Sequence, residues 1–270
     1  MTQDTNPPLI KLATLLPGAL PIKQGQSETW KGNLFNQDGT ITPAYIKIID
    51  EKNLATELLC SVIARELNLP ITQPYLVRIE NRVLESISKE TFAFALEDAE
   101  FPSISSRTRD DDIIKSILVK WPFLYQCAAF DSWIGNNDRL PHNLLFDGFK
   151  SFSLIDHGEA LDHYLTENSV SNNNLIMLLG KESEFEKFSL TKNLLKEADK
   201  FHNIDFKKVR REIISSNGVV RSEIIDSQIA LLQKRLVFLP NIIRTQTGIK
   251  QQDFLYDSQE IITDSNNKES

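Results

Sequence analysis

The chain has 270 residues, of which 41% are hydrophobic and 25% charged, and its formal net charge is −7 at pH 7. This composition is typical of a soluble globular protein, and the length suffices for one large domain or two small lobes with a buried core. The acidic balance argues against nucleic-acid binding, because that affinity comes mostly from Lys and Arg contacts to phosphates. The sequence has no run of about 18 apolar residues for a membrane span and no N-terminal signal pattern. We therefore expect a cytoplasmic protein.

The first 90 residues are predicted to be rich in strands, with one helix. An expected strand precedes the turn-forming segment Asn36-Gln37-Asp38-Gly39, and apolar and polar residues alternate along the return strand after it, which predicts a β-hairpin. Two apolar stripes at helical spacing, ended by Leu69-Pro70, predict one helix. The expected elements are strands over 28–35, 43–49, 74–79 and 82–87 and a helix over 53–67.

From residue 91 onward the sequence is predicted to be mainly helical. Apolar residues between positions 113 and 135 follow a helical pattern that Pro122 divides into two pieces. The clearest helix is expected over 222–239, and the last residues are polar. The expected domains are an N-lobe over 1–90, a helical C-lobe over 91–245 and a polar tail over 246–270.

Three polar residues of the central region have the spacing of a phosphoryl-transfer site. Asp138 and Asn143 are separated by four residues, the D-x-x-x-x-N spacing of a kinase catalytic loop. Asp156 follows a short apolar strand, and a hairpin between Leu144 and Ile155 would bring it close to Asn143. We expect Asp138 to orient or deprotonate an acceptor hydroxyl, and Asn143 and Asp156 to supply oxygen ligands to Mg²⁺.

Upstream residues complete the constellation that binding of ATP requires. Lys47 on its strand and Glu57 on the next helix are expected to form the ion pair that holds a lysine against the α- and β-phosphates. Gly25 and Ser27 lie one strand earlier, where a phosphate-covering loop is expected. Each residue alone has an ordinary structural explanation, such as a solvated strand lysine. The order of all five elements along the chain favours ATP and Mg²⁺ as ligands.

The chain resembles the HipA-like kinases and, more distantly, the phosphatidylinositol 3- and 4-kinases, over about residues 20–240. The resemblance is most specific at Ile134-Gly135-Asn136-Asn137-Asp138-Arg139 and at Ile155-Asp156-His157-Gly158, and it includes the helix and its exit over 57–70. It implies a bilobal, protein-kinase-like α+β fold and an ATP- and Mg²⁺-dependent kinase. The implied reaction transfers the γ-phosphate to a hydroxyl of a protein Ser or Thr. Arg139 is expected to support the catalytic loop electrostatically.

Two positions depart from the pattern of that family. Leu140 stands where the family usually has His, and the phosphate loop has Gly25 and Ser27 in place of a full G-x-G-x-x-G. Ser27 matches a serine that some HipA-like kinases autophosphorylate. Residues 161–174, which are polar and rich in asparagine, are candidates for a mobile loop of the activation type.

Three other functions compete with a protein kinase. A lipid, inositide or small-molecule kinase would use the same residues with a compact acceptor pocket. A nucleotide-binding pseudokinase would explain the departures in the loops, but Asp138 and Asp156 are retained. A metal-dependent phosphohydrolase built on Asp138, Asp156 and His157 would leave Lys47 and Glu57 without a role.

Overall fold

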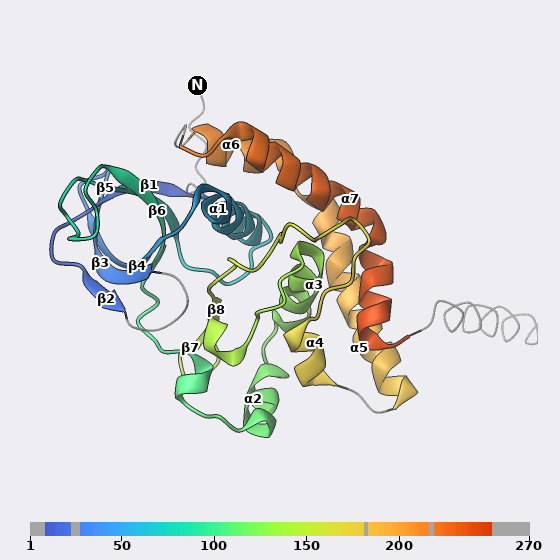
Figure 1. Cartoon of the computed structure of the whole chain (residues 1–270). Coiled ribbons are helices and arrows are strands. Elements are labelled where there is room, and N and C mark those ends of the chain that lie inside the picture. Colours follow the sequence, from blue (N-terminus) through green and yellow to red (C-terminus); the bar gives the residue numbers. More distant parts are fainter. Residues whose placement is uncertain (1–8, 23–27, 181–182, 216–218, 250–270) are drawn as a thin grey trace, which may run out of the picture.

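The computed structural model describes residues 9–22, 28–180, 183–215 and 219–249. The protein is of the mixed α+β class, with a strand-rich N-terminal part followed by a helical C-terminal part (Figure 1). Gly25 and Ser27 lie outside the described residues, so their predicted roles stay predictions.

The strands of the N-terminal part form one sheet that closes on itself. They are β1 (Lys11–Leu15), β2 (Leu20–Ile22), β3 (Glu28–Asn36), β4 (Ile41–Ile48), β5 (Pro74–Ile79) and β6 (Thr91–Glu97). Their order in the sheet is β1-β5-β6-β4-β3-β2, and β1 also pairs with β3, which closes the ring. β1 runs parallel to β5, whereas β3, β4, β6 and β5 pair antiparallel in that order.

The predicted hairpin is confirmed by β3 and β4. Gly39 adopts a φ of +83° in the turn, a conformation that glycine tolerates without a steric penalty. On β4 the side chains of Ala44 and Ile46 are buried inside the sheet, while Tyr45 is exposed on the other face. Lys47 follows the orientation of Tyr45, on the outer face of the sheet, which is where a site residue can meet a ligand.

One predicted strand is wrong, and three strands, β1, β2 and β6, were missed. Residues 82–87 form turns, because Arg82 has a φ of +66° and the Val83 N–H donates to the Glu80 carbonyl. The strand that pairs antiparallel with β5 is β6, and β6 also pairs with β4. The sheet therefore continues past residue 90, where the N-lobe was expected to end.

Helix α1 (Glu51–Glu66) lies between the sheet and the C-terminal helices, and it confirms the predicted helix (Figure 1). It begins at Asp50, whose side chain accepts a hydrogen bond from the Asn53 N–H at 2.9 Å. All residues from Leu54 to Ala64 are buried, because β5 and β6 cover one side of the helix and the C-terminal helices cover the other. This burial fixes Glu57 in the interior.

The C-terminal part is mainly helical, and the predicted break at Pro122 is confirmed. Its elements are α2 (Asp111–Leu118), α3 (Leu124–Ile134), β7 (Leu144–Phe146), β8 (Phe152–Leu154), α4 (Asn174–Leu179), α5 (Glu184–Asp199), α6 (Phe206–Ser215) and α7 (Ser222–Thr247). The hairpin β7–β8 is the one expected, and α7 continues past the expected end at Leu239 through Pro240.

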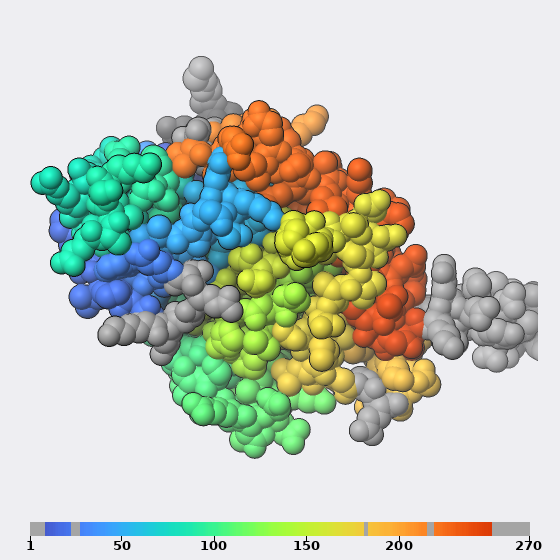
Figure 2. Space-filling model, in the orientation of Figure 1, coloured from blue at the N-terminus to red at the C-terminus, as the bar shows by residue number. Residues whose placement is uncertain are grey.

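The helices of the C-terminal part pack around α3. Helices α5 and α7 contact both α3 and each other, while α6 lies against α1. Trp133 at the end of α3 is fully buried, and its indole N–H donates to the Leu232 carbonyl at 2.9 Å. Figure 2 shows the N-terminal strands, in blue to teal, and the C-terminal helices, in yellow to red, on opposite sides of one face. No helix in the described residues is long and apolar enough to span a membrane.

Candidate active site

Lys47 joins the predicted glutamate and the predicted metal-binding aspartate in one cluster. Its Nζ lies 2.7 Å from Oε1 of Glu57 and 2.7 Å from Oδ1 of Asp156. The three residues come from β4, from α1 and from the segment after β8. Glu57 is buried, whereas the Asp156 side chain is 37% exposed. The cluster is therefore closed on the side of α1 and open to solvent at Asp156.

The charges of this cluster stabilise one another. Burial alone would raise the pKa of Glu57, but the Lys47 ammonium and the contact with His157 hold that pKa well below its usual range. Burial alone would lower the pKa of Lys47, but Glu57 and Asp156 raise it. Lys47 and Glu57 therefore both stay charged at neutral pH. A lysine held in this way can contact phosphates as a fixed positive charge.

Asp138 and Asn143 contact each other, as their spacing predicts. Asn143 Nδ2 donates to Asp138 Oδ2 at 3.1 Å and to the Asp138 carbonyl at 2.7 Å. The Asp138 N–H donates to Asn136 Oδ1 at 3.0 Å, which closes the turn from the other side. Because the carboxylate and both ends of its peptide unit are held, the loop presents Asp138 in one position.

The hairpin β7–β8 brings Asn143 beside the segment that carries Asp156. Asn143 ends the short 3₁₀ helix η2 (Pro141–Asn143), and its carbonyl accepts a hydrogen bond from the Ile155 N–H at 3.3 Å. Asp156 is the next residue. The two predicted metal ligands therefore come from neighbouring main-chain segments, as the sequence analysis expected.

Arg139 lies beneath the predicted catalytic loop, residues 136–143, out of contact with solvent. Its Nε lies 3.2 Å from Oδ2 of Asp131, and both side chains are fully buried. Its Nη1 also donates to the carbonyls of Asn143 and Ile155. One guanidinium thus ties α3, the catalytic loop and the Asp156 segment together. These buried contacts fix the loop in place, and the predicted role of Arg139 in catalysis stays a prediction.

Asp131 was missed in the sequence analysis, although it carried a signal. It stands inside an apolar helical run between Phe130 and Trp133, where a carboxylate needs a partner once it is buried. It binds Arg139 through both oxygens and also accepts from Asn136 Nδ2 at 3.2 Å. The signal that could have identified Asp131 is a charged residue within an apolar helix that directly precedes the predicted catalytic loop.

Two residues at the site adopt left-handed backbone conformations. Asp156 has a φ of +61°, which is uncommon for residues other than glycine and occurs at functional sites. Its Oδ1 accepts a hydrogen bond from the Gly158 N–H at 3.3 Å. Gly135, at φ +70°, ends α3, and a Cβ there would lie 2.5 Å from the Leu165 side chain. A side chain at position 135 would therefore be strained by the backbone conformation and would displace Leu165.

His157 follows Asp156 and is completely buried. Its N–H donates to Oε2 of Glu57 at 3.0 Å, so the main chain beside Asp156 holds the second oxygen of that carboxylate. Its ring lies edge-on to Phe130, with centroids 6.0 Å apart, and burial lowers its pKa. Within the described part of the chain, no group of three or more His, Cys, Asp or Glu side chains could hold a metal alone.

The segment 161–174 is tied to the helices at several points. The Arg235 guanidinium on α7 is buried and donates to the carbonyls of Ser132, Trp133, Thr166 and Ser169. Asn173 Nδ2 donates to the Ala128 carbonyl at 2.7 Å. The segment expected to act as an activation-type loop is therefore anchored at both the end of α3 and α7.

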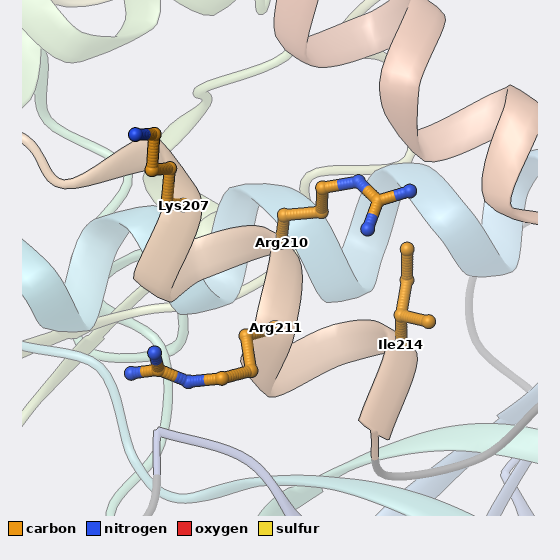
Figure 3. A pocket seen from close by; sticks show the side chains of 4 residues that line it. All are labelled: Lys207, Arg210, Arg211 and Ile214. Atoms are coloured by element: carbon orange, nitrogen blue, oxygen red, sulfur yellow. The ribbon is translucent and has the colours of Figure 1, made fainter.

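A separate hollow of about 350 Å³ lies on α6. It is lined by Lys207, Arg210, Arg211 and Ile214, whose side chains are shown in Figure 3. Arg210 forms an ion pair with Asp226, in which Nε lies 2.5 Å from Oδ1 and Nη2 lies 2.9 Å from Oδ2. None of the predicted site residues that the structure describes lines this hollow.

Comparison with known proteins identifies the class to which this site belongs. The model of the HipA-like kinase family matches residues 23–203, which is more than half of the chain. The chain therefore belongs to the HipA-like kinases, as the motifs predict, and is a phosphotransferase.

A solved structure shows a similar fold. The Helicobacter pylori proinflammatory kinase CtkA superposes with a TM-score of 0.51, covering 80% of this chain and 94% of that one at 15% sequence identity. At this identity the similarity concerns the fold. No curated protein matches the sequence.

Proposed function

We propose that this protein is a cytoplasmic, bilobal kinase that binds ATP and Mg²⁺ between its lobes and phosphorylates a Ser or Thr hydroxyl of a protein. The N-lobe is the region to about residue 90 plus β6, and the C-lobe continues to about residue 245. The contact of Lys47 with both Glu57 and Asp156, at 2.7 Å each, carries this proposal. It unites a residue from each of three separate segments in the arrangement that phosphoryl transfer requires.

Lys47 is proposed to contact the α- and β-phosphates of ATP, with Glu57 fixing its position. The Lys47 ammonium meets Asp156 at the side of the cluster that is open to solvent. A phosphate that enters from this side can therefore reach Lys47. Gly25 and Ser27, which lie outside the described residues, are proposed to cover the phosphates from above.

Asn143 and Asp156 are proposed to hold Mg²⁺. Their donor atoms fit this ion, because Mg²⁺ binds hard oxygen ligands and needs few from the protein when phosphates supply others. The amide nitrogen of Asn143 is already bound to Asp138, which leaves its Oδ1 for the cation. When bound, Mg²⁺ neutralises the negative charge of the phosphates.

Asp138 is proposed to accept the proton of the attacking hydroxyl. The hydroxyl oxygen then forms a bond to the γ-phosphorus as the bond to the leaving ADP oxygen breaks. Asn136 and Asn143 hold Asp138 in place for this step, and Arg139 holds the loop from below. Such an arrangement lowers the barrier mainly by positioning.

The proposal is tested by incubating the purified protein with γ-labelled ATP and Mg²⁺, beside the variants Asp138→Ala and Asp156→Ala. We expect Asp156→Ala to lose the Mg²⁺-dependent thermal stabilisation by ATP. Asp138→Ala should keep that stabilisation and lose transfer by about 100-fold or more. The control Asp199→Ala, which removes an exposed aspartate at the end of α5, should behave as wild type.

The outcomes separate the competing functions. Mg-ATP binding without transfer to any protein, lipid or small molecule would indicate a pseudokinase. Transfer to a lipid or a small molecule alone would replace the protein acceptor. If wild type bound no ATP, or if Asp138→Ala transferred phosphate at the wild-type rate, the assigned roles would be wrong.

A further inference from the structure

A groove of about 230 Å³ opens beside the loop that carries Asp138. Its walls come from the first turn of α2, from the catalytic loop and from α4. Most of the lining is apolar and consists of Leu140, Pro141, Leu144, Leu175 and Leu178. Asp111 contributes a carboxylate from α2.

The groove is fixed relative to the reacting groups. Leu140 is two residues from Asp138, and its N–H donates to the Asp138 carbonyl at 2.8 Å. On the opposite wall, Asn174 Nδ2 donates to the Asn137 carbonyl at 2.6 Å, which ties the start of α4 to the catalytic loop. A molecule held in this groove is therefore placed at a set distance from Asp138.

The accessible charge of the groove is negative. Arg139 also lines it, but this guanidinium is buried against Asp131 and meets no solvent. Asp111 is exposed. Asp110 caps α2 by accepting from the N–H groups of Asp112 and Ile113. Among the charged residues that line the groove, Asp111 is thus the one that offers an exposed charge, and it suits a cation.

The size of the groove selects its occupant. A volume of 230 Å³ is smaller than the roughly 300–1,000 Å³ of pockets that enclose drug-sized ligands. It suits one or two apolar side chains that anchor a longer molecule. The lining residues come from three segments, which are α2, residues 139–144 and α4. An extended chain can lie across such a surface, whereas a small acceptor would leave most of it uncovered.

We propose that this groove binds a segment of the protein acceptor, which places an apolar side chain among Leu140, Leu175 and Leu178 and a Lys or Arg beside Asp111. Binding there presents a nearby Ser or Thr hydroxyl to Asp138. The inference rests on the proposed function, because it names the part of the acceptor that the kinase recognises.

The test uses the full chain and short fluorescent peptides that contain one Ser. The peptides carry Leu or Ala at one varied position and Lys or Glu at another, on either side of the Ser. Binding is measured by fluorescence polarisation without ATP, and transfer is measured separately with γ-labelled ATP and Mg²⁺. We expect Leu/Lys peptides to bind about tenfold more tightly than Ala/Glu peptides.

Two pairs of variants locate this preference in the groove. Asp111→Lys should reverse the preference for Lys over Glu, a change of about five- to tenfold. Asp112→Lys makes the same charge change at the next residue, which does not line the groove, and should keep the preference. Leu178→Trp should fill the groove and weaken binding of Leu peptides about tenfold. Its neighbour Met177→Trp, at an exposed position, should not.

Several results would overturn the docking proposal. They are equal binding of all peptides to wild type, equal effects of Asp111→Lys and Asp112→Lys, and normal peptide preference in Leu178→Trp. Because polarisation needs no ATP, this result is independent of the kinase reaction. Selective peptide binding without Mg-ATP binding or transfer would count against the proposed function and leave the docking groove in place.

Discussion

In both the Lys47 cluster and the Arg139–Asp131 pair a positively charged side chain contacts carboxylates, but the side chains of the two groups differ in their exposure to solvent. The side chains of Lys47 and Asp156 are 18% and 37% exposed, whereas those of Arg139 and Asp131 are 0% and 1% exposed. A pair sealed from water cannot exchange its partner for a ligand, because an unpaired buried charge is very unfavourable. The open cluster can. We therefore expect the sealed pair to hold a loop in place and the open cluster to be the one that can receive a ligand.

The largest effect on stability is expected from breaking the sealed pair. Arg139→Met leaves Asp131 buried without its partner, and the free energy of unfolding should fall by about 3–5 kcal/mol in urea denaturation. Adding Asp131→Leu to the same chain should restore much of the loss, because the buried charge is then gone.

A surface pair of the same type provides the control. Arg210 and Asp226 are each 46% exposed, so Arg210→Met should cost less than about 1 kcal/mol. Equal losses for Arg139→Met and Arg210→Met would mean that burial does not distinguish the two pairs.

Breaking the open cluster should affect activity more than stability. Lys47→Met leaves Glu57 with the His157 N–H as a remaining partner, and we expect a loss of about 1–3 kcal/mol. Phosphate transfer should fall about 100-fold or more, because the positive charge that faces the phosphates is lost with the Lys47 ammonium. Lys31→Met, which removes a half-exposed lysine on β3 paired with Asp98 just after β6, should leave transfer unchanged. A variant at Lys47 with normal transfer would contradict the role of the open cluster.

The smallest expected effect is a pH dependence of stability. The pKa of Glu57 lies below its usual value of 4.5 in the folded protein. As the pH falls below 4.5, the unfolded chain binds a proton at this residue while the folded protein does not. The free energy of unfolding should therefore fall, by up to about 1.4 kcal/mol per pH unit. In Glu57→Gln this part of the slope should be absent, and equal slopes for both proteins below pH 4.5 would refute the depressed pKa.

Local patterns predicted the elements whose sequence period matches their burial. The β3–β4 hairpin, α1 and the break at Pro122 were all found this way. The segment 82–87 has a strand-like composition, but the left-handed turn at Arg82 is not encoded by hydrophobic period. β1 was missed because its parallel pairing with β5 joins residues more than 60 positions apart. The local sequence of β1 carries no signal of this pairing.

The candidate site was predictable where spacing alone specifies the chemistry. The contact between Asp138 and Asn143 and the pairing of Lys47 with Glu57 follow from the order of the motifs. The additional contact of Lys47 with Asp156 depends on how the sheet meets the C-terminal part, which no local pattern describes. The partner of Arg139 was missed for the same reason. Tertiary packing decided which of several carboxylates it met.

The anchor at Arg235 has a consequence for how the sequence of this protein can vary. Its four acceptors are main-chain carbonyls, at residues 132, 133, 166 and 169, which every amino acid provides. Residues 166 and 169 can therefore be replaced without losing these hydrogen bonds, provided the backbone path is kept. Position 235 is thus the one place in this anchor where a particular side chain, that of arginine, is needed. Relatives with the same anchor should keep Arg there and diverge freely across the segment that it holds.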